Sequence, residues 1–370
     1  MNEGLEKRIK ALPALTGIRG VAALWVVLFH SKDIIYQGTG LSDVAALEMG
    51  WFGVDVFFLL SGFILSHVHL EDFRRPSLKA IGSFIYLRFS RIYPVHLFSL
   101  AVVVLFFLVT VALGKPATGR PRFDLDLLIG NLLLIHSWGW AKNDSWNVLS
   151  WSISTEWFMY LLFPALAAFL LSRVRTARAG VFGAAFSLAT MIFVLVALGL
   201  QSTFTTYQWG AIRASGSFVA GCFLYIAYQS GGLPRLPWKW MELGFATWLV
   251  MEVVLLRSSF VALPAAAGLI TCLAFGKGPI SRACSARPVL FLGEISYSLY
   301  MMHMITLEIV FLPISYSRYA NLEGPLLMVW YGIALVAIAF VALWTYNNVE
   351  KPSRTWLRGL IRREPQIQAA

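Results

Sequence analysis

The sequence predicts an all-α protein, a polytopic membrane helix bundle of about ten transmembrane helices with both termini in the cytoplasm. The first observation behind this prediction is composition. Of the 370 residues, 58% are hydrophobic and only 13% are charged, and the mean hydropathy is +0.69. A soluble domain carries about 25% charged residues, so the composition excludes a soluble protein. It also excludes a collagen, a coiled coil, a disordered chain and a disulfide scaffold.

The second observation is the spacing of the apolar stretches. A membrane-spanning helix needs about 20 mostly apolar residues. Ten stretches qualify: 13–35, 51–69, 92–113, 151–171, 180–200, 211–228, 240–256, 259–275, 288–310 and 326–348. The apolar stretch 124–136 is shorter, so we expect an interfacial or re-entrant segment on the outer side. Residues 1–370 are expected to form a single membrane domain, with an amphipathic inner loop at 70–91 and a basic cytoplasmic tail at 349–370.

The third observation is the distribution of basic residues. With the N-terminus inside, 21 of the 30 Lys and Arg residues lie on the cytoplasmic side and seven on the outer side, among them Lys32 at the outer end of the first stretch, and only Arg19 and Arg213 lie deeper within spans. Cytoplasmic loops are enriched in Lys and Arg, so the net charge of +11 is explained by topology, and no nucleic-acid partner is expected. The first span lacks a cleavage signal and should be retained. The three cysteines have no metal-like spacing, so neither a metal nor a disulfide framework is expected.

A few ionisable residues lie inside the apolar stretches, where charge is costly and usually functional. Arg19 and His30 are 11 residues apart, so on a helix they differ by about 20° and lie about 16 Å apart along one face. Asp55, Glu156 and His303 are expected at the depth of His30, in the outer half. A carboxylate can hold the tautomer of a histidine that acts as general base. The alternatives are a core histidine with a snorkelling arginine, or a proton relay.

A second group of candidates lies near the inner side. Arg88, Arg91 and Tyr93 occur in YLRFSRIYP, where the inner loop is expected to turn into the third span at Pro94. Together with Arg19, these arginines could bind a phosphorylated, base-containing ligand. The alternative is that they only anchor the topology at the membrane surface.

Six motifs in order resemble the integral membrane acyltransferase family 3: LTGIRGVAALWVVLFH, GWFGVDVFFLLSGFILS, RFSRIYP, SWSISTEWFMYLLFP, LGEISYSLYMMH and VEKP. The resemblance implies a ten-span bacterial inner-membrane protein. Members of the family move an acyl group, commonly acetyl from acetyl-CoA, to a hydroxyl of a carbohydrate or related acceptor. Bacterial members modify lipopolysaccharide O-antigens, exopolysaccharides, Nod factors and peptidoglycan.

By motif position, His30 is similar to the catalytic histidine of the family and Arg19 to its partner in donor binding. Glu156 falls in the pattern WS-x-x-x-E, and Arg88 and Arg91 match the cytoplasmic arginine element. The resemblance implies acyl-CoA as co-substrate, with no metal. A carbohydrate or lipid-linked glycan is the implied acceptor, and the bilayer is the surrounding partner. Acetyl is the commonest acyl group in the family, and succinyl and others remain open, as does the oligomeric state.

Other residues are weaker candidates. Asp55 is a possible second catalytic carboxylate or a structural partner. Tyr93 is placed with the donor, and His303, Tyr297 and Trp151 are placed along the acceptor path or in aromatic packing. The tryptophans of the outer segment suit either sugar stacking or interfacial anchoring: Trp138, Trp140 and Trp146.

Two mechanisms and a different class of function stay open. His30 acts either as general base for the attacking hydroxyl or through an acyl-histidine intermediate. The competing function is a proton-coupled secondary transporter that uses the same buried histidine and carboxylates. The sequence shows no internal repeat of the kind common in transporters, which favours the enzyme.

Overall fold

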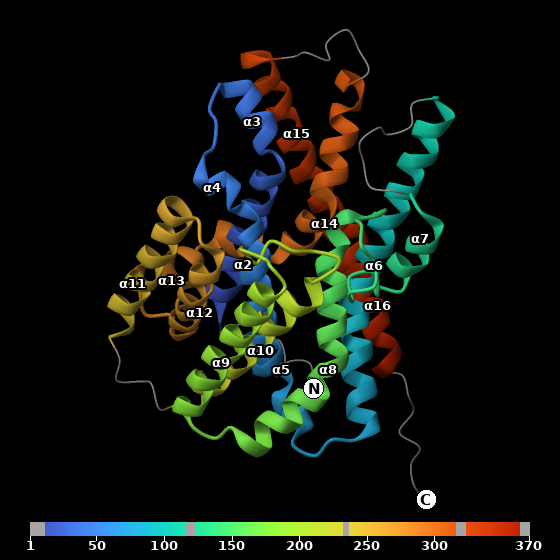
Figure 1. Ribbon diagram of the computed structural model, residues 1–370. Coiled ribbons are helices and arrows are strands. Elements are labelled where there is room, and N and C mark those ends of the chain that lie inside the picture. Colours follow the sequence, from blue (N-terminus) through green and yellow to red (C-terminus); the bar gives the residue numbers. More distant parts are fainter. Residues whose placement is uncertain (1–11, 115–122, 232–236, 316–322, 363–370) are drawn as a thin grey trace, which may run out of the picture.

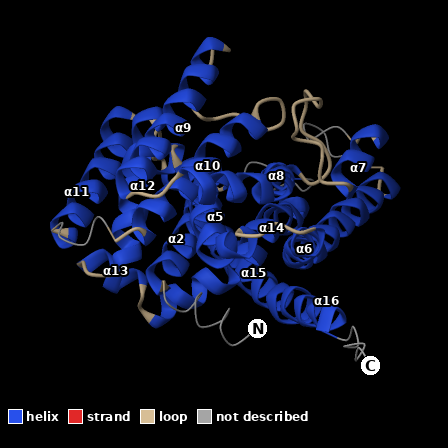
Figure 2. Cartoon of the chain, turned by 90° about the horizontal axis from the view of Figure 1, so that it is seen from below, coloured by secondary structure: helices blue, strands red, loops and turns tan. Residues whose placement is uncertain are grey.

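The computed structural model describes residues 12–114, 123–231, 237–315 and 323–362 (Figure 1). Within these ranges the regular structure is helical, without strands (Figure 2). Eight helices of this part of the chain are long and apolar enough to cross a membrane, and the 17-residue helix Ser259–Phe275 is apolar but shorter. The all-helical, multi-pass prediction is therefore confirmed. The count of ten spans and the orientation of the termini stay predictions.

The helices follow the predicted spans closely. In chain order they are α2 (Pro13–His30), α3 (Lys32–Thr39), α4 (Ala45–Glu48), η1 (Gly50–Phe52), α5 (Gly53–His69), η2 (Leu70–Phe73), α6 (Leu78–Ala112), α7 (Leu125–Leu132), η3 (Val148–Ser150), α8 (Trp151–Arg173), α9 (Ala177–Ala197), α10 (Gly210–Gln229), α11 (Trp238–Met251), η4 (Glu252–Leu256), α12 (Ser259–Phe275), α13 (Pro279–Cys284), α14 (Arg287–Ser315), α15 (Gly324–Thr345), η5 (Tyr346–Glu350) and α16 (Lys351–Arg362).

The centre of the bundle contains α2, α5, α10 and α14 (Figure 2). Helices α2 and α14 run side by side in the same direction, and small residues allow a very close approach between them. A Cβ atom on Gly20 would lie 2.6 Å from the backbone nitrogen of Gly293, and one on Gly293 would lie 2.0 Å from the carbonyl oxygen of Thr16. Small residues at such crossings are typical of membrane helices. This contact aligns α2 with α14 along the length that carries Arg19 and His30.

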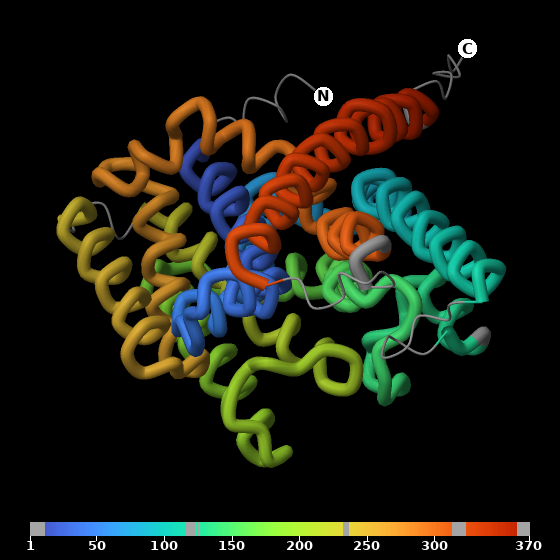
Figure 3. Tube along the Cα trace, turned by 90° about the horizontal axis from the view of Figure 1, so that it is seen from above, coloured from blue at the N-terminus to red at the C-terminus, as the bar shows by residue number. Residues whose placement is uncertain are grey.

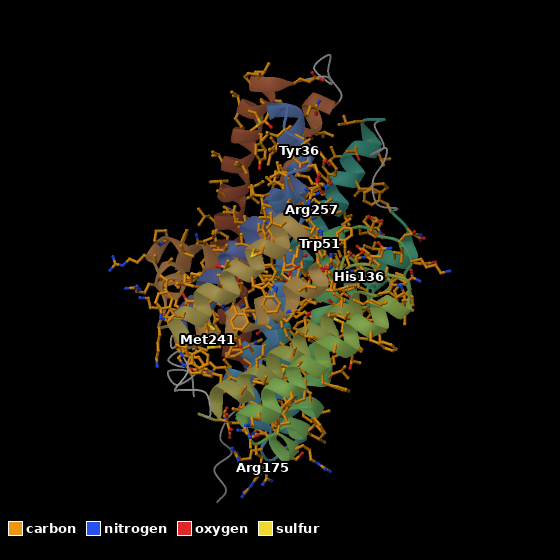
Figure 4. All side chains as sticks on the ribbon, turned by 60° about the vertical axis from the view of Figure 1, so that its left-hand side comes forward. Tyr36, Trp51, His136, Arg175, Met241 and Arg257 are labelled. Atoms are coloured by element: carbon orange, nitrogen blue, oxygen red, sulfur yellow. The ribbon has the colours of Figure 1, made fainter. Side chains whose placement is uncertain are left out.

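The segments predicted as inner and outer lie at opposite ends of the molecule. The α5–α6 and α8–α9 connections lie at the bottom of Figure 1, and α3 lies near the top. Figure 4 likewise places Arg175 at the end opposite to Tyr36. The short helix α7 is only eight residues long, as expected for the segment 124–136.

The prediction of an inner loop at 70–91 is wrong beyond residue 77, because helix α6 begins there. Ser77 caps α6 by accepting a hydrogen bond from the amide of Ala80 at 3.1 Å, and α6 then continues for 35 residues through Pro94. Such a helix is about 52 Å long at a rise of about 1.5 Å per residue, well over the roughly 30 Å hydrocarbon core. A proline is tolerated within a membrane helix because neighbouring groups satisfy the freed carbonyl.

The first predicted span, 13–35, is interrupted at Ser31. The Ser31 amide donates to the carbonyl oxygens of Val27 and Leu28, its hydroxyl donates to Val27, and a separate helix begins at Lys32. The amide and the hydroxyl of Ser31 thus bind carbonyl oxygens in the last turn of α2, where the helix ends. His30 becomes the final residue of a helix rather than one in mid-span.

The predicted tail is also a helix in its described part. Helix α15 continues through η5 into α16, and Figure 3 shows them as one long rod across the outside of the bundle. The Tyr86 hydroxyl donates to the carbonyl oxygen of Leu357 at 2.9 Å, which fixes α16 against α6. Residues 363–370 lie outside the described ranges.

Candidate active site

His30 and His303 form a direct pair at the contact between α2 and α14. His303 Nε2 lies 3.1 Å from His30 Nδ1, and the ring centroids are 5.0 Å apart. The other ring nitrogen of His303, Nδ1, faces the carbonyl oxygens of Tyr300 at 2.7 Å and Leu299 at 3.2 Å. His303 is fully buried, and His30 is partly exposed. The buried ring thus orients the accessible one.

The hydrogen-bond partners assign the tautomers of both rings. Carbonyl oxygens only accept, so His303 carries its proton on Nδ1 and offers the Nε2 lone pair. His30 then carries its proton on Nδ1, which lies between His303 Nε2 and the carbonyl oxygen of Val26 at 3.0 Å. The lone pair of His30 is left on Nε2. A neutral imidazole with one free lone pair is the form a general base requires.

Asp55 does not orient His30, contrary to expectation. Its carboxylate is fully buried and accepts from Arg213 Nε at 2.9 Å, Arg213 Nη2 at 2.7 Å and the Thr203 hydroxyl at 3.0 Å. A buried guanidinium is costly without a counter-charge, and Asp55 supplies it. Asp55 is therefore part of a buried ion pair that joins α5 to α10.

Other N–H groups of the Arg213 guanidinium also have hydrogen-bond partners within the protein. It donates to the carbonyl oxygens of Thr205 at 3.1 Å and Trp51 at 3.3 Å. The guanidinium lies 5.2 Å from the ring centroid of Trp51 and 5.1 Å from that of Trp151, distances at which cation–π attraction operates. Trp151, expected along the acceptor path, is thus buried against this arginine.

Glu156 lies near Arg19 and Arg88 rather than near His30. Its Oε1 accepts from the hydroxyls of Ser61 and Tyr160, each at 2.5 Å. Its charge is in electrostatic range of Arg19 and Arg88. The expectation that Glu156 contacts the histidine is therefore wrong.

The depth at which α8 begins explains this position. The outer segment folds along its first turn: Ser154 donates to the carbonyl oxygen of Leu134 at 2.9 Å, and the Trp138 indole donates to the Ser154 carbonyl at 2.9 Å. The Ser152 hydroxyl lies 2.8 Å from that of Tyr300, one turn from His303 on α14. Glu156 is therefore a further turn of α8 away from the histidine level.

Four arginines gather at the opposite end of the α2–α14 contact, and we refer to Arg19, Arg88, Arg91 and Arg354 as the arginine cluster. Arg19 donates twice to the carbonyl oxygen of Gly293, at 2.7 and 3.2 Å. Arg88 is buried and lies 3.0 Å from Nε2 of His69. Arg19 and His30 therefore both contact α14, as expected for two residues on the same face of α2.

Arg91 and Arg354 are half-buried, and neither has a hydrogen-bond or ion-pair partner among the described residues. Both lie in electrostatic range of Arg19 and of each other. The carboxylates in range of the cluster are Glu156, Glu294 and Glu350. Glu350 accepts from the Ser298 hydroxyl at 2.7 Å, and Glu294 is exposed, where solvent screens its charge. Four guanidinium groups against three carboxylates leave the cluster with a net positive charge, as an anion-binding site has.

Two tyrosines lie near the arginine cluster. Tyr93 stacks on Phe89 with ring centroids 4.4 Å apart; on α6 Arg91 lies between them in sequence and on a different face of the helix, so the donor role of Tyr93 stays a prediction. Tyr297 donates to the carbonyl oxygen of Ile92 at 2.5 Å. On α14 it lies six residues before His303, in the direction of the arginines, and its assignment to the acceptor path stays a prediction.

Two functional contacts were missed by sequence reasoning. The partner of Asp55 is Arg213, which could have been suggested by its being one of two basic residues within predicted spans. Arg354 was assigned to the tail, although it follows the motif VEKP in an amphipathic stretch.

The part of the chain that the structure describes holds no group of three His, Cys, Asp or Glu side chains that could bind a metal.

Comparison with known proteins now identifies the family. The acyltransferase domain model of acyltransferase family 3 matches residues 12–344. The chain belongs to this family. The match covers the histidine pair, the Asp55–Arg213 pair and every arginine of the cluster except Arg354. It includes five of the six motifs, all but VEKP, so the resemblance to this family is confirmed.

Several curated relatives are similar to the chain. Acyltransferase MdmB of Streptomyces mycarofaciens is 34% identical over 164 residues, covering 42% of this chain and 39% of the relative. O-acetyltransferase OatA of Staphylococcus aureus is 23% identical over 379 aligned positions, covering 93% of this chain and 57% of the relative. Protein 2 in picA locus of Rhizobium radiobacter is 36% identical over 115 residues, covering 31% of this chain and 54% of the relative.

The matches thus span between 39% and 57% of the length of these three relatives. No solved structure matches the chain.

Proposed function

We propose that this protein is a bacterial inner-membrane O-acyltransferase that moves an acyl group, acetyl as the first choice, from cytoplasmic acyl-CoA to a hydroxyl of an extracytoplasmic or lipid-linked carbohydrate such as an exopolysaccharide or O-antigen. The observation that carries the proposal is the His30–His303 pair, which leaves His30 Nε2 free at one end of α2. At the other end of the same helix face, Arg19 belongs to a cluster with excess positive charge. An O-acetyltransferase among the relatives supports the acyl group and the oxygen acceptor.

The arginine cluster suits the donor. Acyl-CoA carries phosphates and an adenine, and arginine binds phosphate bidentately and stacks on aromatic rings. Arg91 and Arg354 have no hydrogen-bond or ion-pair partner among the described residues and can bind such a ligand, and Tyr93 with Phe89 offers a stacked aromatic pair on the same helix as Arg91. The pantetheine arm would then extend along α2, toward His30.

The chemistry is a transfer from a thioester to an alcohol. His30 Nε2 takes the proton of the acceptor hydroxyl as its oxygen attacks the thioester carbonyl carbon. The carbon–sulfur bond breaks, and the proton on Nε2 passes to the leaving thiolate, giving an ester and free CoA. In the covalent alternative, Nε2 itself attacks the thioester and the hydroxyl then displaces the imidazole. Both routes need the lone pair on Nε2, which the contact with His303 exposes.

His30→Ala tests the proposal. We expect release of CoA from acetyl-CoA, in the presence of de-O-acylated surface glycan, to fall by about 10²–10⁴-fold, the usual contribution of a general base. The protein should stay folded in the membrane. His67→Gln is the matched control, since this histidine of α5 packs on Tyr225, with ring centroids 5.5 Å apart, and belongs to neither the pair nor the cluster.

The readouts separate the candidate functions. Mass spectrometry of surface glycans from cells with and without the protein names the acyl group and the modified species. Acceptor-dependent CoA release identifies an enzyme, whereas solute flux without acyl transfer identifies the proton-coupled transporter. Wild-type rates in a correctly inserted His30→Ala variant would refute the catalytic assignment.

A further inference from the structure

An exposed aromatic side chain lies close to the histidine pair. Phe204, in the segment between α9 and α10, is 52% exposed. Its ring centroid lies 6.2 Å from that of Phe29 and 5.0 Å from that of Trp51. Phe29 in turn lies 5.0 Å from the ring of His30. A row of touching rings therefore leads from the surface of the protein to His30.

The backbone around Phe204 is held on both sides. The amide of Thr203 donates to the Ser259 hydroxyl at 2.9 Å, and the Thr203 hydroxyl donates to Asp55 at 3.0 Å. On the other side, Arg213 donates to the carbonyl oxygen of Thr205 at 3.1 Å. The buried Asp55–Arg213 pair therefore fixes both neighbours of Phe204.

Trp51 completes the support. One face of its indole ring lies against the Arg213 guanidinium, at 5.2 Å, and Phe204 packs on the ring at an interplanar angle of 58°. Figure 4 places Trp51 between the ends of the molecule marked by Tyr36 and Arg175, at the level of the central helices. A large apolar ring is thus exposed on a rigid base, the arrangement expected of a preorganised binding surface.

We propose that Phe204, backed by Trp51 and Phe29, is the platform on which a sugar ring of the acceptor stacks while one of its hydroxyls reaches His30 Nε2. This inference rests on the proposed function. The C–H face of a pyranose is apolar and packs on an aromatic ring, while its hydroxyls point outward from the ring edge. The Asp55–Arg213 pair is then a positioning element for the acceptor and takes no part in proton transfer.

The tryptophans of the outer segment suit this role less well. Their indole N–H groups are used in holding backbone: Trp138 donates to Ser154, Trp140 to Ile135 and Trp146 to Asp124. Among the described residues, the ring contacts of these tryptophans do not reach the histidine pair, whereas those of Phe204 lead through Phe29 to His30. The platform is therefore placed on the α9–α10 segment.

The test compares Phe204→Ala, Phe204→Leu and Phe204→Trp in the full chain, reconstituted in vesicles with acetyl-CoA. The acceptors are de-O-acylated surface polysaccharide and glycerol, which has hydroxyls but no ring. We expect the Ala and Leu variants to raise the KM for polysaccharide about tenfold, since stacking contacts are worth about that factor. Rates with glycerol and the KM for acetyl-CoA should not change, and Phe204→Trp should retain the wild-type KM.

Phe193→Ala is the matched control, because Phe193 is 73% exposed on α9 and has no ring contact with the His30 row. The platform is overturned if Phe204→Ala lowers rates with both acceptors equally, if it leaves the polysaccharide KM unchanged, or if Phe193→Ala raises that KM as much. Failure of the wild-type protein to acylate either acceptor overturns the proposed function itself.

Discussion

Arg213 and Arg91 both lie in helices of the bundle, but their surroundings are opposite. Arg213 is 1% exposed and is surrounded by a carboxylate, two carbonyl oxygens and two indole rings. Arg91 is half-buried, lacks a partner among the described residues, and faces Arg19 and Arg354. An arginine compensated by its own protein stabilises the fold, whereas an uncompensated one is available to an external anion.

The histidine pair combines both conditions in one contact. His303 is satisfied at both ring nitrogens, by carbonyl oxygens and by His30. His30 is satisfied only at Nδ1, and its Nε2 stays free. Compensated groups therefore hold the site, and the proposed function assigns the uncompensated groups to the substrates.

The largest expected effect is on the compensated arginine. Arg213→Met leaves the Asp55 carboxylate buried without its partner, and we expect a loss of about 3–5 kcal/mol in the free energy of unfolding. The double variant Asp55→Leu/Arg213→Met should recover most of this loss, since a hydrophobic replacement of a buried ion pair is often neutral. Denaturant unfolding in detergent measures both. A single variant as stable as wild type would contradict the structural role.

The second effect is on the uncompensated arginines. Arg91→Met/Arg354→Met should raise the KM for acyl-CoA by about 10–100-fold, because hydrogen bonds to charged groups are worth about 1.5–3 kcal/mol. Stability should stay the same or increase, since like charges are removed. The control is Arg173→Met, at the exposed end of α8. A fall in stability comparable with that of Arg213→Met would remove the contrast between the two regions.

A third effect separates the two histidines. His303→Leu removes one of the two acceptors of the His30 Nδ1 proton and leaves only the Val26 carbonyl oxygen. The ring of His30 is then held less firmly, and we expect kcat to fall about tenfold, below the 10²–10⁴-fold of the base itself. His303→Gln can still accept that hydrogen bond and should restore much of the rate. KM for acyl-CoA should not change in either variant. Equal losses in both variants would indicate a packing role instead.

The smallest effect concerns an exposed pair, Asp43 and Arg257, in which Arg257 Nη1 lies 2.5 Å from the carboxylate. The hydrogen bond from Arg257 lowers the pKa of Asp43 below its ordinary value of 3.8. The stabilisation is therefore present above about pH 3.8 and is lost as the pH falls below it. Arg257→Gln should lower the melting temperature slightly at neutral pH, with the difference vanishing in acid. A difference that persists at low pH would contradict this linkage.

The sequence predicted much of the fold because membrane spans are local. Each needs only a long apolar run, so helices from Gly53 to Thr345 begin and end near the predicted positions. The errors occur where a single side chain or a long-range contact decides. Ser31 ends α2 by bonding to its last carbonyls, and Ser77 starts α6 fourteen residues before the predicted third span. Neither signal is strong in a composition profile.

The sequence predicted which residues belong to the candidate site, but not which of them contact one another. Arg19 and His30 share a helix face by arithmetic alone. The partners of His30, Asp55 and Glu156 come from helices far apart in the sequence. Depth estimates placed Asp55 and Glu156 near His30, but α8 begins inside the bundle, since the segment before it folds against Ser154.

The sequence alone determined that this chain is a helical membrane protein of the acyltransferase family. It also determined that Arg19 and His30 share one helix face. Composition, periodicity and motif order suffice for this, because they are properties of the sequence itself. Only the tertiary structure decided which charges cancel. Buried polar groups pair with whichever partner packing brings within about 3 Å, so Asp55 pairs with Arg213 and His30 with His303, whereas Arg91 has no such partner among the described residues.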